Sequence, residues 1–65
     1  MPSDADLYAR ATLEIDRHGP NAADHAIDMM MHLVRLQDRD RASQWLQIAY
    51  AIETLTELEA AGATH

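Results

Sequence analysis

The sequence contains no cysteine, no lysine and no phenylalanine, and only two glycines and two prolines. Without cysteine the chain cannot form disulfides, bind metal through thiolates or use a thiol as a nucleophile. Without lysine, five arginines carry all of the positive side-chain charge against eleven acidic residues, which leaves a net charge of −6. Such an acidic chain repels phosphate backbones and anionic lipid headgroups, so we predict no nucleic-acid partner and no membrane partner.

Long apolar runs are missing as well, and turn-forming residues are too few for a sheet of many strands. Alanine, leucine and methionine supply most of the hydrophobic residues, and these three types favour helix. The first residues do not combine a basic segment with an apolar run, as a secretory signal does. We therefore predict an all-α protein without a membrane-spanning segment, located in the cytoplasm.

A length of 65 residues has room for one domain, and local signals divide it into three helices. Ser3 is a good N-cap, and Asp38 and Asp40 are both good caps for the last helix. Gly62 is predicted as the C-cap of that helix. Gly19 followed by Pro20 marks the clearest helix end, with Gly19 predicted in a left-handed conformation. The sequence thus predicts one compact three-helix bundle over residues 1–65, with helices at about 3–18, 21–36 and 40–60.

Helical periodicity also predicts which residues form the core. Trp45 begins the strongest apolar stripe, so we predict this large side chain at the centre of the core. The helix at 21–36 is apolar around most of its circumference, which is typical of a buried helix, and we predict it to be the central element. The stripe that begins at Trp45 contains Trp45, Ile48, Ala49, Ile52, Leu55 and Thr56.

Four histidines raise the question of a metal site. Within the second helix, His25, Asp28 and His32 share one face and offer imidazole and carboxylate ligands for Zn²⁺ or Ni²⁺. We favour the alternative, an ordinary solvent-exposed pair of Asp28 and His32, because no neighbour is committed as a fourth ligand. His18 lies before the helix break, so we interpret its seven-residue spacing from His25 as chance. We therefore predict no bound metal and no cofactor.

No arrangement of residues points to catalysis. The acidic residues are spread over faces that we expect to be solvated, neither serine lies in a nucleophile elbow, and no glycine-rich phosphate loop is present. We predict that the protein is not an enzyme and has no catalytic residues. Three short helices are also compatible with a helix-turn-helix, but the exposed residues expected on the third helix are acidic or neutral, which disfavours DNA.

A recognisable order of motifs runs along the chain: Arg17-His18-Gly19, an alanine-rich helix with Asp28, Gln37-Asp38, Trp45, Ile48, Ala51-Ile52 and Leu55. This order resembles a group of short alphaproteobacterial proteins of unknown function. The resemblance covers about residues 7–58. The chain departs from the pattern at the second turn, where Gln37 and Arg41 replace glycines. The resemblance implies no activity, so it leaves the function open.

Apolar residues left over after the bundle is built indicate self-association. A core of this size without disulfides is thin, and small domains often need a partner subunit. We predict a non-enzymatic interaction module that forms a homo-oligomer, most simply a dimer, or binds another protein. Its predicted interaction residues are Leu13, Leu46 and Tyr50. A small metal-binding protein that uses the histidines of the second helix and a DNA-associated regulator are the alternatives.

Overall fold

The computed structural model describes residues 3–63, and it describes side chains for residues 3–60. Helices make up almost all of this part of the chain, so the protein is all-α, as predicted. The order is α1 (Asp4–His18), a 3-10 turn η1 (Gly19–Asn21), α2 (Ala22–Arg35) and α3 (Arg39–Ala63). Because η1 joins α1 to α2 without a gap, residues 4–35 form one long bent helical segment. The predicted count of three separate helices is therefore only partly matched.

The helix boundaries lie close to the local signals that predicted them. The Ser3 hydroxyl accepts a hydrogen bond from the N–H of Asp6 at 3.2 Å, and the Asp6 carboxylate accepts one from the N–H of Ser3 at 3.3 Å. This reciprocal capping box starts α1. Asp38 caps α3 through a single hydrogen bond, because its Oδ1 accepts from the N–H of Arg41 at 3.2 Å.

The turn between α2 and α3 is closed by two backbone hydrogen bonds. The N–H of Asp38 donates to the carbonyl of Leu33 at 2.9 Å, and the N–H of Gln37 donates to the carbonyl of Val34 at 3.0 Å. This pair of bonds is the Schellman motif, whose turning residue has a positive φ. Gln37 takes that position with a φ of 61°, where a glycine would be less strained.

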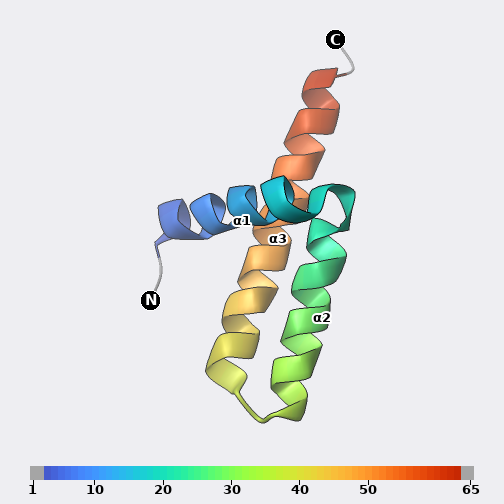
Figure 1. Cartoon of the computed structure of the whole chain (residues 1–65). Coiled ribbons are helices and arrows are strands. Elements are labelled where there is room, and N and C mark those ends of the chain that lie inside the picture. Colours follow the sequence, from blue (N-terminus) through green and yellow to red (C-terminus); the bar gives the residue numbers. More distant parts are fainter. Residues whose placement is uncertain (1–2, 64–65) are drawn as a thin grey trace.

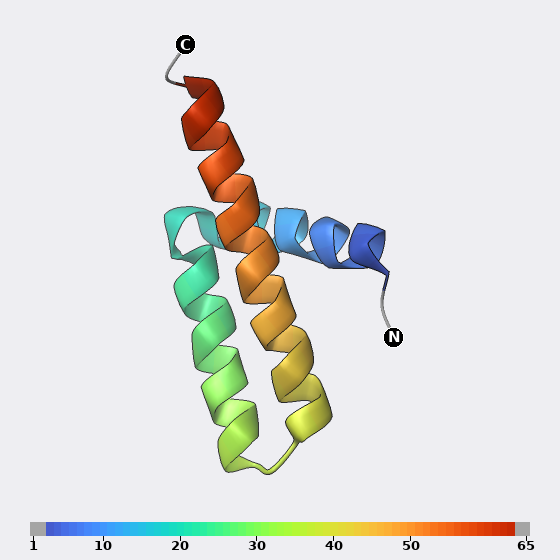
Figure 2. The same cartoon turned by 180° about the vertical axis from the view of Figure 1, so that it is seen from behind.

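The helices α2 and α3 form an antiparallel pair, and α1 crosses α3 and joins α2 at its upper end (Figure 1). Seen from behind, α3 lies in front of α1, and its last turns extend beyond the crossing (Figure 2). The molecule measures 44 × 23 × 16 Å, with a radius of gyration of 12.3 Å. A compact chain of this length has a radius of gyration of about 11 Å. The protein is thus more elongated than the predicted bundle. None of the helices in residues 3–63 has the length and apolar composition needed to cross a membrane.

The core lies where α1 and α2 meet α3, and it is built mainly from small side chains. Alanine dominates it, which allows the helix axes to approach closely and leaves little side-chain volume to fill. The larger members, Ile48 and Ile52, come from the middle of α3. The buried hydrophobic residues are Ala11, Ala22, Ala26, Leu33, Ala42, Ile48, Ala49, Ala51 and Ile52.

Two predictions about the core are wrong. Trp45 is only partly buried and packs against the edge of the core, because the residues that α1 covers on α3 are the later ones, around Ile48 and Ile52. The central helix is α3, which packs against both α1 and α2. In residues 3–63 no helix packs against the far side of α2, so Met31 and Val34 stay exposed.

Gly19→Ala is expected to lower the free energy of unfolding by about 1.5 kcal/mol. Gly19 has a positive φ of 58°, as predicted, but its ψ of −130° lies outside the left-handed helical region and is almost restricted to glycine. Among the described residues, no atom other than those of Gly19 and its two chain neighbours lies within 4 Å of where a Cβ would be, so backbone strain alone causes the loss. Urea denaturation followed by circular dichroism measures it.

The reverse substitution at the other turn is the control. Gln37→Gly removes the strain of a non-glycine residue at positive φ and is expected to raise the free energy of unfolding by up to about 1 kcal/mol. If Gly19→Ala leaves stability unchanged while Gln37→Gly raises it, the bend after α1 is not strained as described.

Candidate functional site

A buried carboxylate, Glu14, lies on the face of α1 that packs against the other helices. Only 2% of the residue is exposed. One carboxylate oxygen, Oε1, accepts a hydrogen bond from Nε of Arg10 at 3.1 Å. The other, Oε2, is buried without a hydrogen-bond partner among the described residues. An ionised oxygen buried without a partner costs free energy, so the groups that face Oε2 decide what this site can do.

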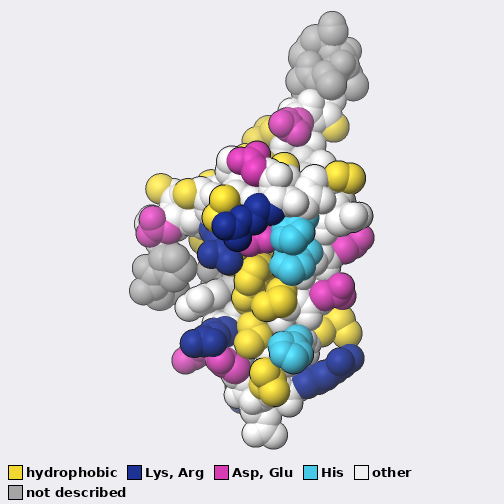
Figure 3. All heavy atoms as spheres, viewed as in Figure 1, with side chains coloured by type: hydrophobic (Ala, Val, Ile, Leu, Met, Phe, Trp, Pro, Cys, Tyr) yellow, Lys and Arg dark blue, Asp and Glu magenta, His cyan; other side chains and the backbone are white. Residues whose placement is uncertain are grey.

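Two imidazole rings face Oε2. Nε2 of His18 lies 3.4 Å from this oxygen, and Nε2 of His25 lies 3.9 Å from it. The two rings stack with centroids 4.0 Å apart and an angle of 23° between their planes. Both are partly exposed, and two neighbouring histidines are visible at the surface in Figure 3. We refer to Glu14, His18 and His25 as the Glu14 cluster.

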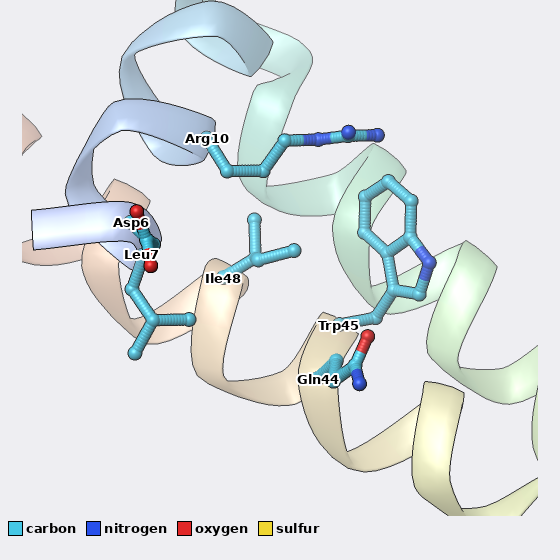
Figure 4. A pocket seen from close by; sticks show the side chains of 6 residues that line it. All are labelled: Asp6, Leu7, Arg10, Gln44, Trp45 and Ile48. Carbon is cyan, nitrogen blue, oxygen red and sulfur yellow. The ribbon is translucent and has the colours of Figure 1, made fainter. Parts of the chain in front are cut away.

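Arg10 and Trp45 border the Glu14 cluster. The guanidinium carbon of Arg10 lies 5.3 Å from the centre of the Trp45 ring, in a cation–π contact. Figure 4 shows Arg10 extending from α1 toward this indole on α3, at one side of a groove between the two helices. His25 meets the same indole edge to face, with 5.8 Å between centroids. Trp45 therefore contacts both the residue that orients Glu14 and one of the two imidazoles.

The cluster differs from the metal site that was considered from the sequence. Asp28 and His32 are exposed and do not belong to the cluster, so of the three candidate residues only His25 does. The spacing of His18 and His25 was interpreted as chance, yet the structure stacks the two rings on each other. The helix break that was taken to separate them is a continuous 3-10 turn, and its bend brings the last turn of α1 and the first turn of α2 side by side.

A second feature is an exposed apolar surface along α1 and α3. Leu46 and Tyr50 are exposed one turn apart on α3, as predicted. Tyr8 of α1, which the helical periodicity placed on the apolar stripe of that helix, is exposed instead, and it lines a groove together with Tyr50. We call Tyr8, Leu46 and Tyr50 the tyrosine surface. Leu13 is exposed too, but five residues after Tyr8 it lies on a different face of α1.

Sequence reasoning missed Glu14 and Arg10 as members of a site. Glu14 follows Ala11 by three residues and precedes His18 by four, so it lies on the apolar face of α1. A charged residue in that position is the signal that could have revealed it. Arg10 lies four residues before Glu14, a spacing that favours a side-chain pair. It is then expected to be the partner of a buried carboxylate and not part of a solvated stripe.

Comparisons of this chain with protein-family models, with curated proteins and with solved structures find no match. The resemblance to short alphaproteobacterial proteins therefore stays a prediction.

Proposed function

We propose that the protein is a non-enzymatic interaction module that pairs with a second copy of itself through the tyrosine surface. The observation that carries this proposal is that small apolar side chains fill the core while large ones are exposed, the reverse of what is usual in a folded domain. The core consists mostly of alanine, whereas large apolar side chains, Tyr8, Leu46 and Tyr50 among them, stand in solvent. A domain with so little apolar volume inside gains stability by covering apolar surface outside.

The composition of the surface favours a protein partner. Tyrosine is enriched at protein interfaces because its ring buries a large apolar area while its hydroxyl stays hydrated or forms a hydrogen bond. Tyr8 and Tyr50 come from two different helices and line one groove, which offers a concave site for a side chain of the partner. In a two-fold dimer each copy would supply both the groove and the side chain that fills it.

The net charge of −6 sets the expected salt dependence. Two copies of this acidic chain repel each other. Glu53 and Glu57 add to this repulsion, because they are exposed on α3, three and seven residues after Tyr50 of the tyrosine surface. Salt screens this repulsion and does not weaken apolar contacts, so the dimer is expected to tighten as salt is added. The same acidic residues oppose DNA, which disfavours the regulator hypothesis. A cytoplasmic location is part of this proposal.

Sedimentation equilibrium over a hundredfold range of protein concentration tests the proposal. We expect a reversible dimer with a dissociation constant in the micromolar range, tighter at high salt than at low salt. Tyr50→Ser and Leu46→Ser should each weaken it about tenfold or more, because a two-fold interface loses both copies of the side chain.

Leu36→Ser is the matched control. Leu36 is 62% exposed, close to the 63% of Tyr50, but it caps the far end of α2 and is not part of the tyrosine surface. We expect it to leave the dimer unchanged. A monomer at every concentration, or dissociation caused by Leu36→Ser and not by Tyr50→Ser, contradicts the proposal.

A further inference from the structure

The Glu14 cluster presents one carboxylate oxygen and two imidazole nitrogens at a common point. One ligand atom from each of the three residues lies within 4.8 Å of the others. Ligands of tetrahedral Zn²⁺, about 2.0–2.1 Å from the ion, lie about 3.3 Å from one another. The distances from Oε2 to the two Nε2 atoms, 3.4 and 3.9 Å, are already close to this spacing.

The buried oxygen is an independent sign that this point takes a cation. Oε2 of Glu14 has no hydrogen-bond partner within the described part of the chain, although almost every buried polar atom in a folded protein has one. The bond from Arg10 to Oε1 fixes the carboxylate so that Oε2 faces the histidines. Hydrogen bonds of this kind from outside the ligand set orient the carboxylates of metal sites. A cation bound to Oε2 would remove the cost of leaving it unpaired.

We propose that Glu14, His18 and His25 form a binding site for Zn²⁺ at the bend between α1 and α2. Two imidazoles and one carboxylate suit zinc and related transition metals, whereas Mg²⁺ and Ca²⁺ prefer sites made of oxygen ligands. The three protein ligands leave a fourth position for water. The rings stack at 23°, so they must rotate apart by about 50° before both planes contain an ion at bonding distance. Both side chains are partly exposed, which leaves room for this rotation.

The neighbours of the site set its expected affinity. Arg10 places a positive charge on the other carboxylate oxygen and opposes the ion, and two of the three ligands are partly exposed. We therefore expect a dissociation constant in the micromolar range, weaker than that of a structural zinc site with four protein ligands. The bound ion would join α1 to α2 across η1 and raise the melting temperature by mass action. This site is independent of the tyrosine surface.

Isothermal titration calorimetry of the whole, chelator-treated chain with ZnCl₂ is the test. We expect one Zn²⁺ per chain and no comparable heat with MgCl₂ or CaCl₂. Trp45 is the only tryptophan and contacts His25, so its fluorescence should change with the same saturation curve. A titration without binding, or with a Trp45 signal that does not follow the heat, overturns the proposal.

Three variants assign the ligands. Glu14→Gln, His18→Asn and His25→Asn should each weaken binding at least tenfold, whereas His32→Asn should not change it. His32 is the control because it lies on α2, is exposed and is outside the cluster. Far-UV circular dichroism selects folded variants, and His25, at the surface, tests the site even if Glu14→Gln unfolds. Unchanged affinity in folded His18→Asn and His25→Asn, or a tenfold loss in His32→Asn, overturns the assignment.

Discussion

Ile52→Ala is expected to lower the free energy of unfolding by about 3 kcal/mol. Ile52 is 2% exposed and is one of the few large side chains in a core otherwise made of alanine. Its removal leaves a cavity that neighbouring alanines are too short to fill, so the loss includes both burial and packing terms. A domain of this size has few kcal/mol of stability in total, and the variant should be largely unfolded at 37 °C.

Thermal and urea denaturation, at one fixed protein concentration, measure this loss. Leu58→Ala on the same helix is the control, because Leu58 is 64% exposed and has the same number of side-chain atoms to lose. We expect that variant to stay within about 0.5 kcal/mol of the parent. Equal effects of the two substitutions would mean that the core does not lie at the crossing of α1 over α3.

Arg10→Met is expected to lower the free energy of unfolding by about 2 kcal/mol. Arg10 donates the hydrogen bond that holds the buried carboxylate of Glu14, and methionine keeps the apolar stem while removing the donor. The loss is smaller than for a fully buried ion pair, because the Arg10 side chain is 47% exposed and solvent screens it. Urea denaturation at neutral pH gives the value.

A second substitution separates the charge from the packing. In Arg10→Met/Glu14→Leu no buried carboxylate needs a partner, and we expect most of the lost stability to return. Arg17→Met is the matched control on the exposed side of α1 and should cost about 0.5 kcal/mol or less. A double variant no more stable than Arg10→Met would show that the Arg10–Glu14 contact is not what stabilises the fold.

The sequence by itself determined the elements of the fold. The helical composition predicted an all-α chain, and the predicted helix ends lie within one residue of the observed ones at His18, Arg35 and Arg39. These features are local: a cap, a turn glycine or a helix-forming run acts through residues three or four positions away. The predicted end of the third helix at residue 60 falls short of Ala63, where α3 ends in the structure. Gly62, the predicted C-cap, lies inside α3 instead, because a single glycine weakens a helix without preventing the helical conformation.

The sequence also determined part of the exposed surface. Leu46 and Tyr50 were predicted on the outer side of their helix. Around the helix axis, each lies more than about 90° from the centre of the apolar stripe. The periodicity of α1 placed Leu13 outside as well. Each of these predictions concerns one helix at a time, and a helix has the same angular spacing wherever it packs.

Only the tertiary structure decided how the helices meet, and the errors come from that step. A helix that is apolar nearly all round looks central, but the crossing angle of α1 made α3 the shared partner and left one side of α2 open. Because of the same crossing, the side chains of α3 that are buried at the core come after Trp45 in the sequence, and Trp45 itself lies at the edge. Crossing angles depend on how side chains from both helices fit together, and one helical pattern is compatible with several angles.

The Glu14 cluster shows this difference most clearly. Glu14, His18 and His25 follow one another at intervals of four and seven residues. Whether their side chains come together nevertheless depends on the direction of the bend at η1. Gly19 and Pro20 predict an interruption of the helix but not the angle at which the chain leaves it. Because that angle stacks His18 on His25 above Glu14, the candidate metal site exists only in the folded protein.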